Sequence, residues 1–223
     1  AHQLRTPVAG VVALAEAVQS APNEAAARRR SAELVEAARE ASALTDKLLS
    51  FERANGTDIT LAGERIDLRA LVLEAAETFR SRNHTGTVDL SVDVPDQGVF
   101  VHGDPVMVRE AVLNLLTNAL IHGGPDLSTI RIDLTHKKDR IRVSVQDDGI
   151  GIPAERRLEA LSRFSQIGTG PGSGLGLAIA SKVMSNHGGQ LDIAHSAIGG
   201  LIVLTFPTEH PRDRARAVAA GRA

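Results

Sequence analysis

The chain has 223 residues, of which 43% are hydrophobic, and a formal net charge of −2. This length suffices for one domain with its own core plus a smaller element, and the near-neutral charge gives no electrostatic reason to expect a nucleic-acid partner. The absence of cysteine excludes disulfides and cysteine-based metal sites, and no apolar run approaches the roughly 18 residues of a membrane-spanning helix. The sequence starts inside a helical pattern without Met, so we expect it to be a fragment.

Residues 1–55 predict a helical hairpin. Residues 20–23 (Ser-Ala-Pro-Asn) break the helical pattern and separate two helices. Apolar residues recur along one face of the first helix: Leu4, Val8, Val11, Ala15 and Val18. Apolar residues at two heptad positions give the second helix a coiled-coil seam: Leu34, Ala41 and Leu48, with Ala37, Leu44 and Phe51. Two helices cannot bury such seams alone, so we predict a homodimer in which two hairpins form a four-helix bundle.

Residues 56–64 predict a linker, and residues 65–207 predict an α+β two-layer sandwich. The expected elements are a helix at 67–82, a strand at 88–94, a short apolar run at 99–101, a helix from Asp104-Pro105 to 123–124, strands at 130–135 and 141–145 joined at 138–139, a glycine-rich segment at 168–176, a helix ending at 187–189, and strands at 191–194 and 201–206. We expect helices on one face of a mixed or antiparallel sheet, and a disordered tail at 208–223.

Residues 114–119 (Asn-Leu-Leu-Thr-Asn-Ala) fall within the helix that starts near Asp104. Asn114 and Asn118 are four residues apart and therefore share one helix face. Mg²⁺ prefers oxygen ligands and keeps waters and phosphates in its shell, so one amide oxygen is a sensible protein ligand. A single Asn could equally cap a helix or bond to backbone, and only the strings that follow favour a metal.

Asp147 ends a predicted strand and precedes Gly149 and Gly151, whose missing side chains would let a flat base approach the backbone. A carboxylate there can accept a hydrogen bond from the exocyclic amine of adenine. An ordinary Asp-Gly turn would have the same sequence.

Residues 172–177 (Gly-Ser-Gly-Leu-Gly-Leu) are not a Walker loop but lead into a helix whose first amides can hold phosphate oxygens. This density of glycine suggests a lid, although a flexible loop would look the same.

The first helix carries His2, with Thr6 one turn later on the same face. An unperturbed imidazole is mostly neutral and nucleophilic at neutral pH. Pro7 removes an amide bond and predicts a kink beside His2. We expect solvated side chains at the scattered histidines without metal-ligand spacing: His84, His102, His136, His187, His195 and His210.

With these strings in this order, the chain resembles the kinase core of a two-component sensor histidine kinase. Residues 2–7 (His-Gln-Leu-Arg-Thr-Pro) resemble its H box, residues 114–119 its N box, residues 147–151 its first glycine box and residues 172–177 its second. Residues 161–164 (Leu-Ser-Arg-Phe) lie where such kinases carry the F box, at the start of the ATP lid. Gyrase, a heat-shock chaperone and mismatch-repair ATPases share the ATP-binding fold, and the H box separates a kinase from them.

The resemblance implies ATP-dependent phosphorylation of His2, followed by transfer to an aspartate of a response regulator, with ATP and Mg²⁺ required. It implies a homodimer, a receiver-domain partner, and a chain that is the cytoplasmic portion of a membrane-anchored bacterial sensor. The catalytic residues it implies are His2, Gln3, Thr6, Glu110 and Arg163. The cofactor-binding residues it implies are Asn114, Asn118 (the Mg²⁺ ligand), His122, Asp147, Gly149, Gly151, Phe164, Gly172, Gly174, Leu175 and Gly176.

The sequence departs from the family pattern at three places. Gln3 stands where many such kinases have an acidic general base, and Gln cannot accept a proton, so Glu110 or water would replace it. Ile121 replaces a basic residue, although His122 could still stack on adenine, and Ser162 replaces an acidic residue of the F box.

Four functions therefore remain open: an active kinase that also dephosphorylates its regulator, a phosphatase-dominant protein, a nucleotide sensor without transfer, and an ATPase. Thr6 matches the position that orients water in regulator dephosphorylation. The ATPases place Glu at the position of Asn114 to activate water, so Asn disfavours hydrolysis. We favour the active kinase.

Overall fold

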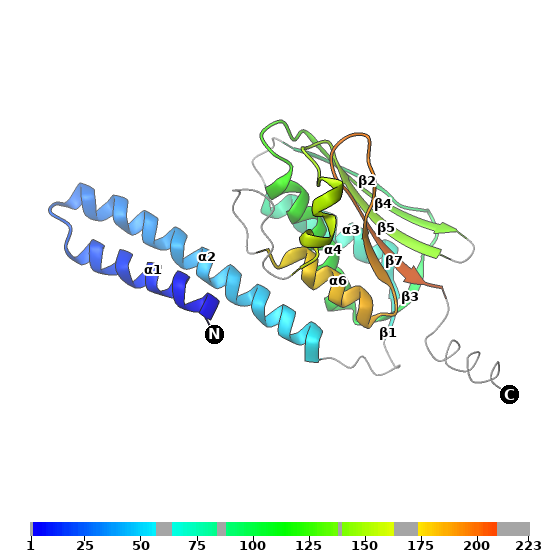
Figure 1. Cartoon of the computed structure of the whole chain (residues 1–223), viewed down its shortest axis with the longest axis horizontal. Helices are drawn as coiled ribbons and strands as arrows, with labels where there is room; N and C mark the ends of the chain where they lie inside the picture. Colours follow the sequence, from blue (N-terminus) through cyan, green and yellow to red (C-terminus); the bar gives the residue numbers. More distant parts are fainter. Residues whose placement is uncertain (1, 57–63, 84–87, 138–139, 163–173, 209–223) are drawn as a thin grey trace. The chain divides into compact units, whose positions relative to one another are not determined.

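The computed structural model describes residues 2–56, 64–83, 88–137, 140–162 and 174–208 (Figure 1). The chain divides into two compact units, residues 1–52 and residues 53–223. The first is helical and the second combines helices with a sheet, as the sequence predicted. Over the described ranges, no helix is both long and apolar enough to span a membrane. Residues 57–63 of the predicted linker (56–64), the turn at 138–139 and residues 209–223 of the predicted tail (208–223) lie outside the described residues; Gly56 ends a helix and Glu64 begins a strand.

The predicted hairpin consists of α1 (His2–Gln19) and α2 (Glu24–Gly56), and the first unit contains all of it except the last turn of α2. The break falls where the sequence placed it, because Asn23 caps the second helix by accepting the Ala26 amide at 2.9 Å. Arg30 donates to the carbonyl oxygen of Ala17 at 2.6 Å and so satisfies an end group of α1.

The apolar seam of α2 is half-buried in the single hairpin: Leu34, Ala37, Ala41, Leu44 and Leu48. On α1, Val11, Ala15 and Val18 are also half-buried, and Val8 is 52% exposed. This incomplete burial agrees with the expectation that two helices alone cannot cover these stripes. The side chains of Leu4 and Phe51 lie outside the described part of the structure.

The second unit contains a five-stranded sheet in the order β2-β4-β5-β7-β6. Its strands are β2 (Asp89–Asp93), β4 (Thr129–Lys137), β5 (Arg140–Asp147), β6 (Gln190–Ile193) and β7 (Leu201–Pro207). β2 runs parallel to β4, and all other neighbours are antiparallel. The helices α3 (Leu68–Arg82), α4 (Pro105–His122) and α6 (Gly176–Asn186) lie on one side of the sheet (Figure 1). The α+β two-layer sandwich is therefore confirmed.

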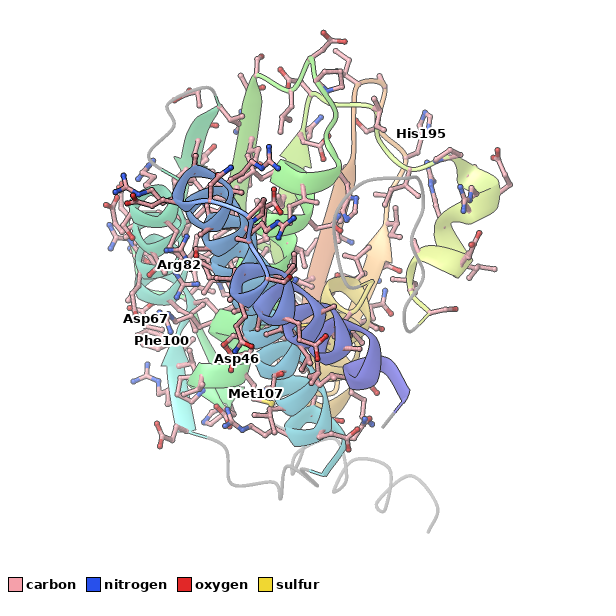
Figure 2. The ribbon with its side chains drawn as sticks, turned by 90° about the vertical axis from the view of Figure 1, so that its left-hand side faces the viewer. Asp46, Asp67, Arg82, Phe100, Met107 and His195 are labelled. Carbon is pink, nitrogen blue, oxygen red and sulfur yellow. The ribbon has the colours of Figure 1, made fainter. Side chains whose placement is uncertain are left out.

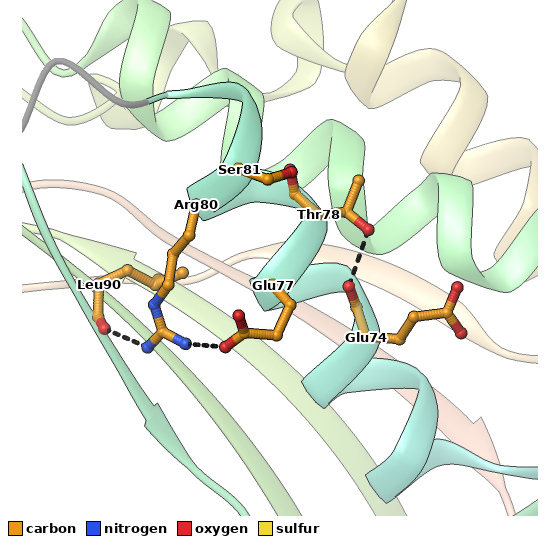
Figure 3. A network of polar contacts seen from close by, with 6 residues as sticks. All are labelled: Glu74, Glu77, Thr78, Arg80, Ser81 and Leu90. Atoms are coloured by element: carbon orange, nitrogen blue, oxygen red, sulfur yellow. Dashed lines mark hydrogen bonds and ion pairs between the residues drawn. The ribbon is translucent and has the colours of Figure 1, made fainter.

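The helix α3 begins where the sequence predicted because Asp67 caps it, accepting the Arg69 amide at 3.0 Å. Arg80 donates to Glu77 at 2.6 Å and to the carbonyl oxygen of Leu90 at 2.9 Å, which ties α3 to the edge strand β2 (Figure 3). The predicted core residues of α3 are all buried: Leu68, Leu71, Val72, Ala75 and Phe79.

The structure contains a two-stranded ladder of β1 (Glu64–Asp67) and β3 (Phe100–Gly103), of which the sequence indicated only a short apolar run at 99–101. Asp67 and Phe100 are partners in this ladder and lie next to each other in Figure 2. β1 contains one buried residue, Ile66, so its sequence has no strand pattern and pairing with β3 makes it a strand. The short helices η1 (Ala154–Arg156) and α5 (Arg157–Ala160) were not predicted either.

One histidine expected to be solvated is not. His187 is only 4% exposed, because Gly103 leaves room for its ring and backbone groups satisfy both of its nitrogens. His102, His136 and His195 are exposed, and Figure 2 labels the last of them. His84 and His210 lie outside the described residues.

Candidate functional site

The helix α4 presents a polar face of Glu110, Asn114 and Asn118 on successive turns. All three side chains are half-buried. The opposite face is buried against the core, as the spacing predicted: Val112, Leu115, Leu116 and Ala119. Asp104 fixes the start of α4 by accepting the Val106 and Met107 amides at 2.9 and 3.1 Å, and Pro105 occupies the first turn.

Asn114 lies against the beginning of α6. A Cβ atom on Gly176 would lie 3.6 Å from Asn114 Oδ1, so the N-box residue and the second glycine string meet. Asn114 Nδ2 is buried and has no hydrogen-bond partner among the described residues. An unpaired buried amide costs about 1–3 kcal/mol, so this atom indicates a polar partner such as a bound ligand.

The two oxygens of the Asp147 carboxylate have different surroundings at the end of β5. Oδ1 accepts the amides of Gly149 at 3.0 Å and Gly200 at 2.9 Å. Oδ2 has no hydrogen-bond partner in the described part of the chain. The Asp147 amide also donates to the carbonyl oxygen of Gly200 at 3.0 Å, so the carboxylate is held in place with one oxygen left as an acceptor.

The predicted glycines at 149 and 151 allow a close approach, but the approaching group is neighbouring backbone. A Cβ on Gly149 would lie 2.1 Å from the Gly123 carbonyl oxygen, just after α4. Gly151 has a φ of 65°, and a Cβ there would lie 2.5 Å from the carbonyl oxygen of Gly199. Three loops are therefore packed backbone to backbone around Asp147.

Sequence reasoning missed Asp148. Its carboxylate accepts the Ser128 and Thr129 amides, each at 2.9 Å, and the Ser128 hydroxyl at 2.5 Å. These bonds, led by that from the hydroxyl, hold the pKa of Asp148 well below its usual range. The side chain joins the end of β5 to the start of β4, and no local pattern signals a partner 20 residues away.

The remaining candidates divide by position. His122 is the last residue of α4 and half-buried, Gly174 has a φ of 63°, and Leu175 is fully buried at the start of α6. His2, Gln3 and Thr6 lie on α1, with side chains outside the described set. Arg163, Phe164 and Gly172 lie outside the described residues.

The C-terminal half of α4 is thus the centre of the site. Gly123 joins it to the loop that follows Asp147, and Asn114 joins it to the N-terminus of α6. A carboxylate oxygen, amide side chains and a helix N-terminus suit a nucleotide, because they can meet its base, its metal and its phosphates respectively. The unpaired Asn114 Nδ2 is a buried donor that fits an oxygen acceptor of such a ligand.

Comparison with known proteins supports this description. Residues 103–210 match a family model described as histidine kinase-, DNA gyrase B- and HSP90-like ATPase. The sensor-like histidine kinase SenX3 of Mycobacterium tuberculosis is 30% identical over 215 residues, covering 92% of this chain and 52% of the relative. The chain spans about half the length of the curated relatives that it matches first.

Solved structures agree. The mycobacterial sensor histidine kinase MprB is 31% identical, with a TM-score of 0.56 over 65% of this chain and 97% of that one. The histidine kinase ThkA, solved in complex with the response regulator protein TrrA, is 19% identical and has a TM-score of 0.73 over 93% of this chain and 59% of that one. The latter likeness shows that the fold extends over both the hairpin and the α+β unit. The chain belongs to the sensor histidine kinases.

Proposed function

We propose that this chain transfers the γ-phosphoryl group of ATP to His2 and then to an aspartate of a response regulator. The observation that carries the proposal is that two groups meet at α4. Asn114, with its buried unpaired Nδ2, contacts the start of α6, and the loop after Asp147, whose carboxylate keeps one unpaired oxygen among the described residues, contacts the end of α4. The relatives named histidine kinases and the complex of ThkA with a regulator support the chemistry and the partner.

Within the site, Asp147 Oδ2 accepts the exocyclic amine of adenine. Asn118 provides an amide oxygen to Mg²⁺, which when bound neutralises phosphate charge, and Asn114 binds the same metal–phosphate cluster. The amides at the start of α6, from Gly174 to Gly176, hold phosphate oxygens. Gly149 and Gly151 keep the adenine loop in place through their contacts with the backbone of neighbouring loops.

The phosphoryl acceptor is His2. The unprotonated imidazole nitrogen forms the new bond to the γ-phosphorus as the bond to ADP breaks, and the ring then loses the proton on its second nitrogen. Gln3 cannot take that proton, so we assign its removal to Glu110 or water. Arg163 and Phe164 act at the ATP lid, and Thr6 with Gln3 positions water when the regulator is dephosphorylated.

The hairpin supports a homodimer. Four of its large apolar side chains are about half exposed: Val8 and Val12 at 52%, Val35 at 49% and Leu49 at 51%. A second hairpin would bury them in a four-helix bundle. We also propose, from the family resemblance, that the chain is the cytoplasmic portion of a membrane-anchored sensor.

Labelled ATP tests the proposal directly. The purified chain is given γ-labelled Mg-ATP, with His2→Gln as the paired variant. Acid-labile, base-stable label on the wild type alone is expected for phosphohistidine at residue 2. Label on both proteins would move the acceptor elsewhere, and binding of ATP without label would favour a nucleotide sensor.

A further inference from the structure

The buried His187 joins two helices that form the candidate site. Its Nε2 lies 3.0 Å from the backbone amide of Asp104, and its Nδ1 lies 2.7 Å from the carbonyl oxygen of Val183. An amide nitrogen can only donate, so Nε2 must accept, and Nδ1 carries the proton that bonds to Val183. The geometry therefore requires the neutral tautomer with hydrogen on Nδ1.

The surrounding backbone is shaped for this ring. A Cβ atom on Gly103 would lie 2.1 Å from His187 Cδ2, so any larger residue at 103 would displace the imidazole. Gly103 ends β3 and precedes Asp104, whose carboxylate caps α4. The ring thus sits between the end of a strand, the first turn of α4 and the last turn of α6.

Two contacts, one at each end of α6, show how α6 lies along α4. His187 meets Asp104 at one end, and Gly176 meets Asn114 at the other, so the two helices run antiparallel. The contacts are 10 residues apart on α4 (104 to 114) and 11 apart on α6 (176 to 187), or about 15 Å and about 16 Å at ~1.5 Å per residue. The matching lengths mean that both contacts are satisfied in the same register of α6 on α4, and the buried apolar residues of the two helices pack around them.

We propose that His187 is a positioning residue for the nucleotide site: by binding the Asp104 amide it sets the register of α6 on α4. That register fixes where the first amides of α6 stand relative to Asn114 and Asn118. The inference rests on the proposed function, since the register matters to catalysis only if these groups share a nucleotide. His187 itself touches neither the phosphates nor the metal.

Protonation would open this contact. A hydrogen on Nε2 would face the Asp104 N–H, and the hydrogen bond between α6 and α4 would be lost. Burial lowers the pKa of His187, while the bond to Val183 and the charge of Asp104 oppose that shift. Asp104 is the charged group that acts on the ring. The other titratable residues on the adjoining elements are His102 on β3, Arg109, Glu110 and His122 on α4, Lys182 on α6 and Asp192 on β6. The unfolded chain takes up the proton first, so the stability contribution is present above about pH 6.5 and falls as pH drops from there toward the lowered native pKa.

The experiment compares His187→Leu, which removes both bonds, with His187→Gln, which can keep an acceptor near Asp104. His136→Leu, at an exposed histidine on β4, is the matched control. A non-hydrolysable ATP analogue with Mg²⁺ is titrated into each protein after circular dichroism shows it folded. We expect an increase in Kd of about tenfold for His187→Leu and at most about threefold for His187→Gln, with no change for His136→Leu.

Two readouts separate positioning from a purely structural role. The first is rescue: His187→Gln, which keeps an acceptor for the Asp104 amide, should recover most of the affinity that His187→Leu loses. Wild-type Kd in folded His187→Leu, or the same loss in both variants, would overturn the proposal. If His187→Leu does not fold, a loss well above about threefold in His187→Gln would overturn it. Nitrogen-15 NMR of the imidazole should report hydrogen on Nδ1, and hydrogen on Nε2 would contradict the contact. If wild type binds no analogue, the proposed function fails, and the NMR result still decides whether the contact exists.

Discussion

Asp147 shows how a single carboxylate can be both structural and ligand-binding. Two amides occupy Oδ1, and their donors come from the loops at Gly149 and Gly200. The fixed Oδ1 orients Oδ2, which has no partner among the described residues. A group held in this way can accept a hydrogen bond without losing entropy on binding.

Replacing Asp147 by Asn separates these two roles. The amide oxygen can still accept from Gly149 and Gly200, so the fold should survive, but an NH₂ group would now face the adenine amine. A charge-assisted hydrogen bond contributes about 1.5–3 kcal/mol, so we expect Kd for ATP to rise by about tenfold or more. Asp126→Asn, at an exposed aspartate in the loop after α4, serves as the control. Calorimetric titration that finds unchanged affinity for Asp147→Asn would remove Asp147 from the site.

Local pattern explains which site residues could be found from sequence. Asn114, Asn118 and Asp147 belong to short strings whose spacing carries the information. Asp148 and His187 could not be found, because their partners lie 20 and 83 residues away and only the folded sheet and helix pair bring them together.

Among the elements, helix boundaries were predictable because their caps are local. Asp67 and Asp104 cap α3 and α4 with hydrogen bonds to amides two or three residues later. The strand β1 and the short helix α5 have no such signals, since β1 depends on its pairing with β3 and α5 spans only Arg157–Ala160. The sequence therefore predicted the elements that have local caps and missed the short elements that lack them.

The glycines of the two nucleotide strings should differ in what they tolerate. A Cβ at Gly149 would overlap the Gly123 carbonyl oxygen at 2.1 Å, whereas a Cβ at Gly176 would meet Asn114 at an ordinary 3.6 Å. We expect Gly149→Ala to lower the free energy of unfolding by about 1–3 kcal/mol, because two loops must separate. Gly176→Ala should be neutral or stabilising by about 0.5 kcal/mol in a helix. Urea unfolding of both variants measures this, and equal effects would mean that the loop contact at Gly149 yields easily.

At the scale of the whole molecule, the proposed acceptor and the proposed nucleotide site belong to different units. His2 lies in the unit of residues 1–52, and Asn114 and Asp147 lie in the unit of residues 53–223. Each unit was predictable by itself, since heptad spacing describes the hairpin and alternating strands with capped helices describe the sandwich. Self-association could be predicted only indirectly. The sequence shows that the hairpin has more apolar surface than two helices can bury, but it does not show which surface covers it.

The exposed apolar side chains of the hairpin allow the predicted homodimer to be tested. Val35 and Leu49 are two heptads apart and so lie on one line along α2, and both are about half exposed, at 49% and 51%. Leu49→Glu would place a charge in the centre of a bundle, which costs several kcal/mol, so we expect a dimer for wild type and a monomer for this variant. Val106→Glu, an equally drastic change at a side chain 62% exposed on α4, should leave the dimer intact. Sedimentation equilibrium over a range of concentrations distinguishes these states. A wild-type chain that stays monomeric, or a Leu49→Glu dimer as tight as wild type, would show that this line of α2 is not where two hairpins meet.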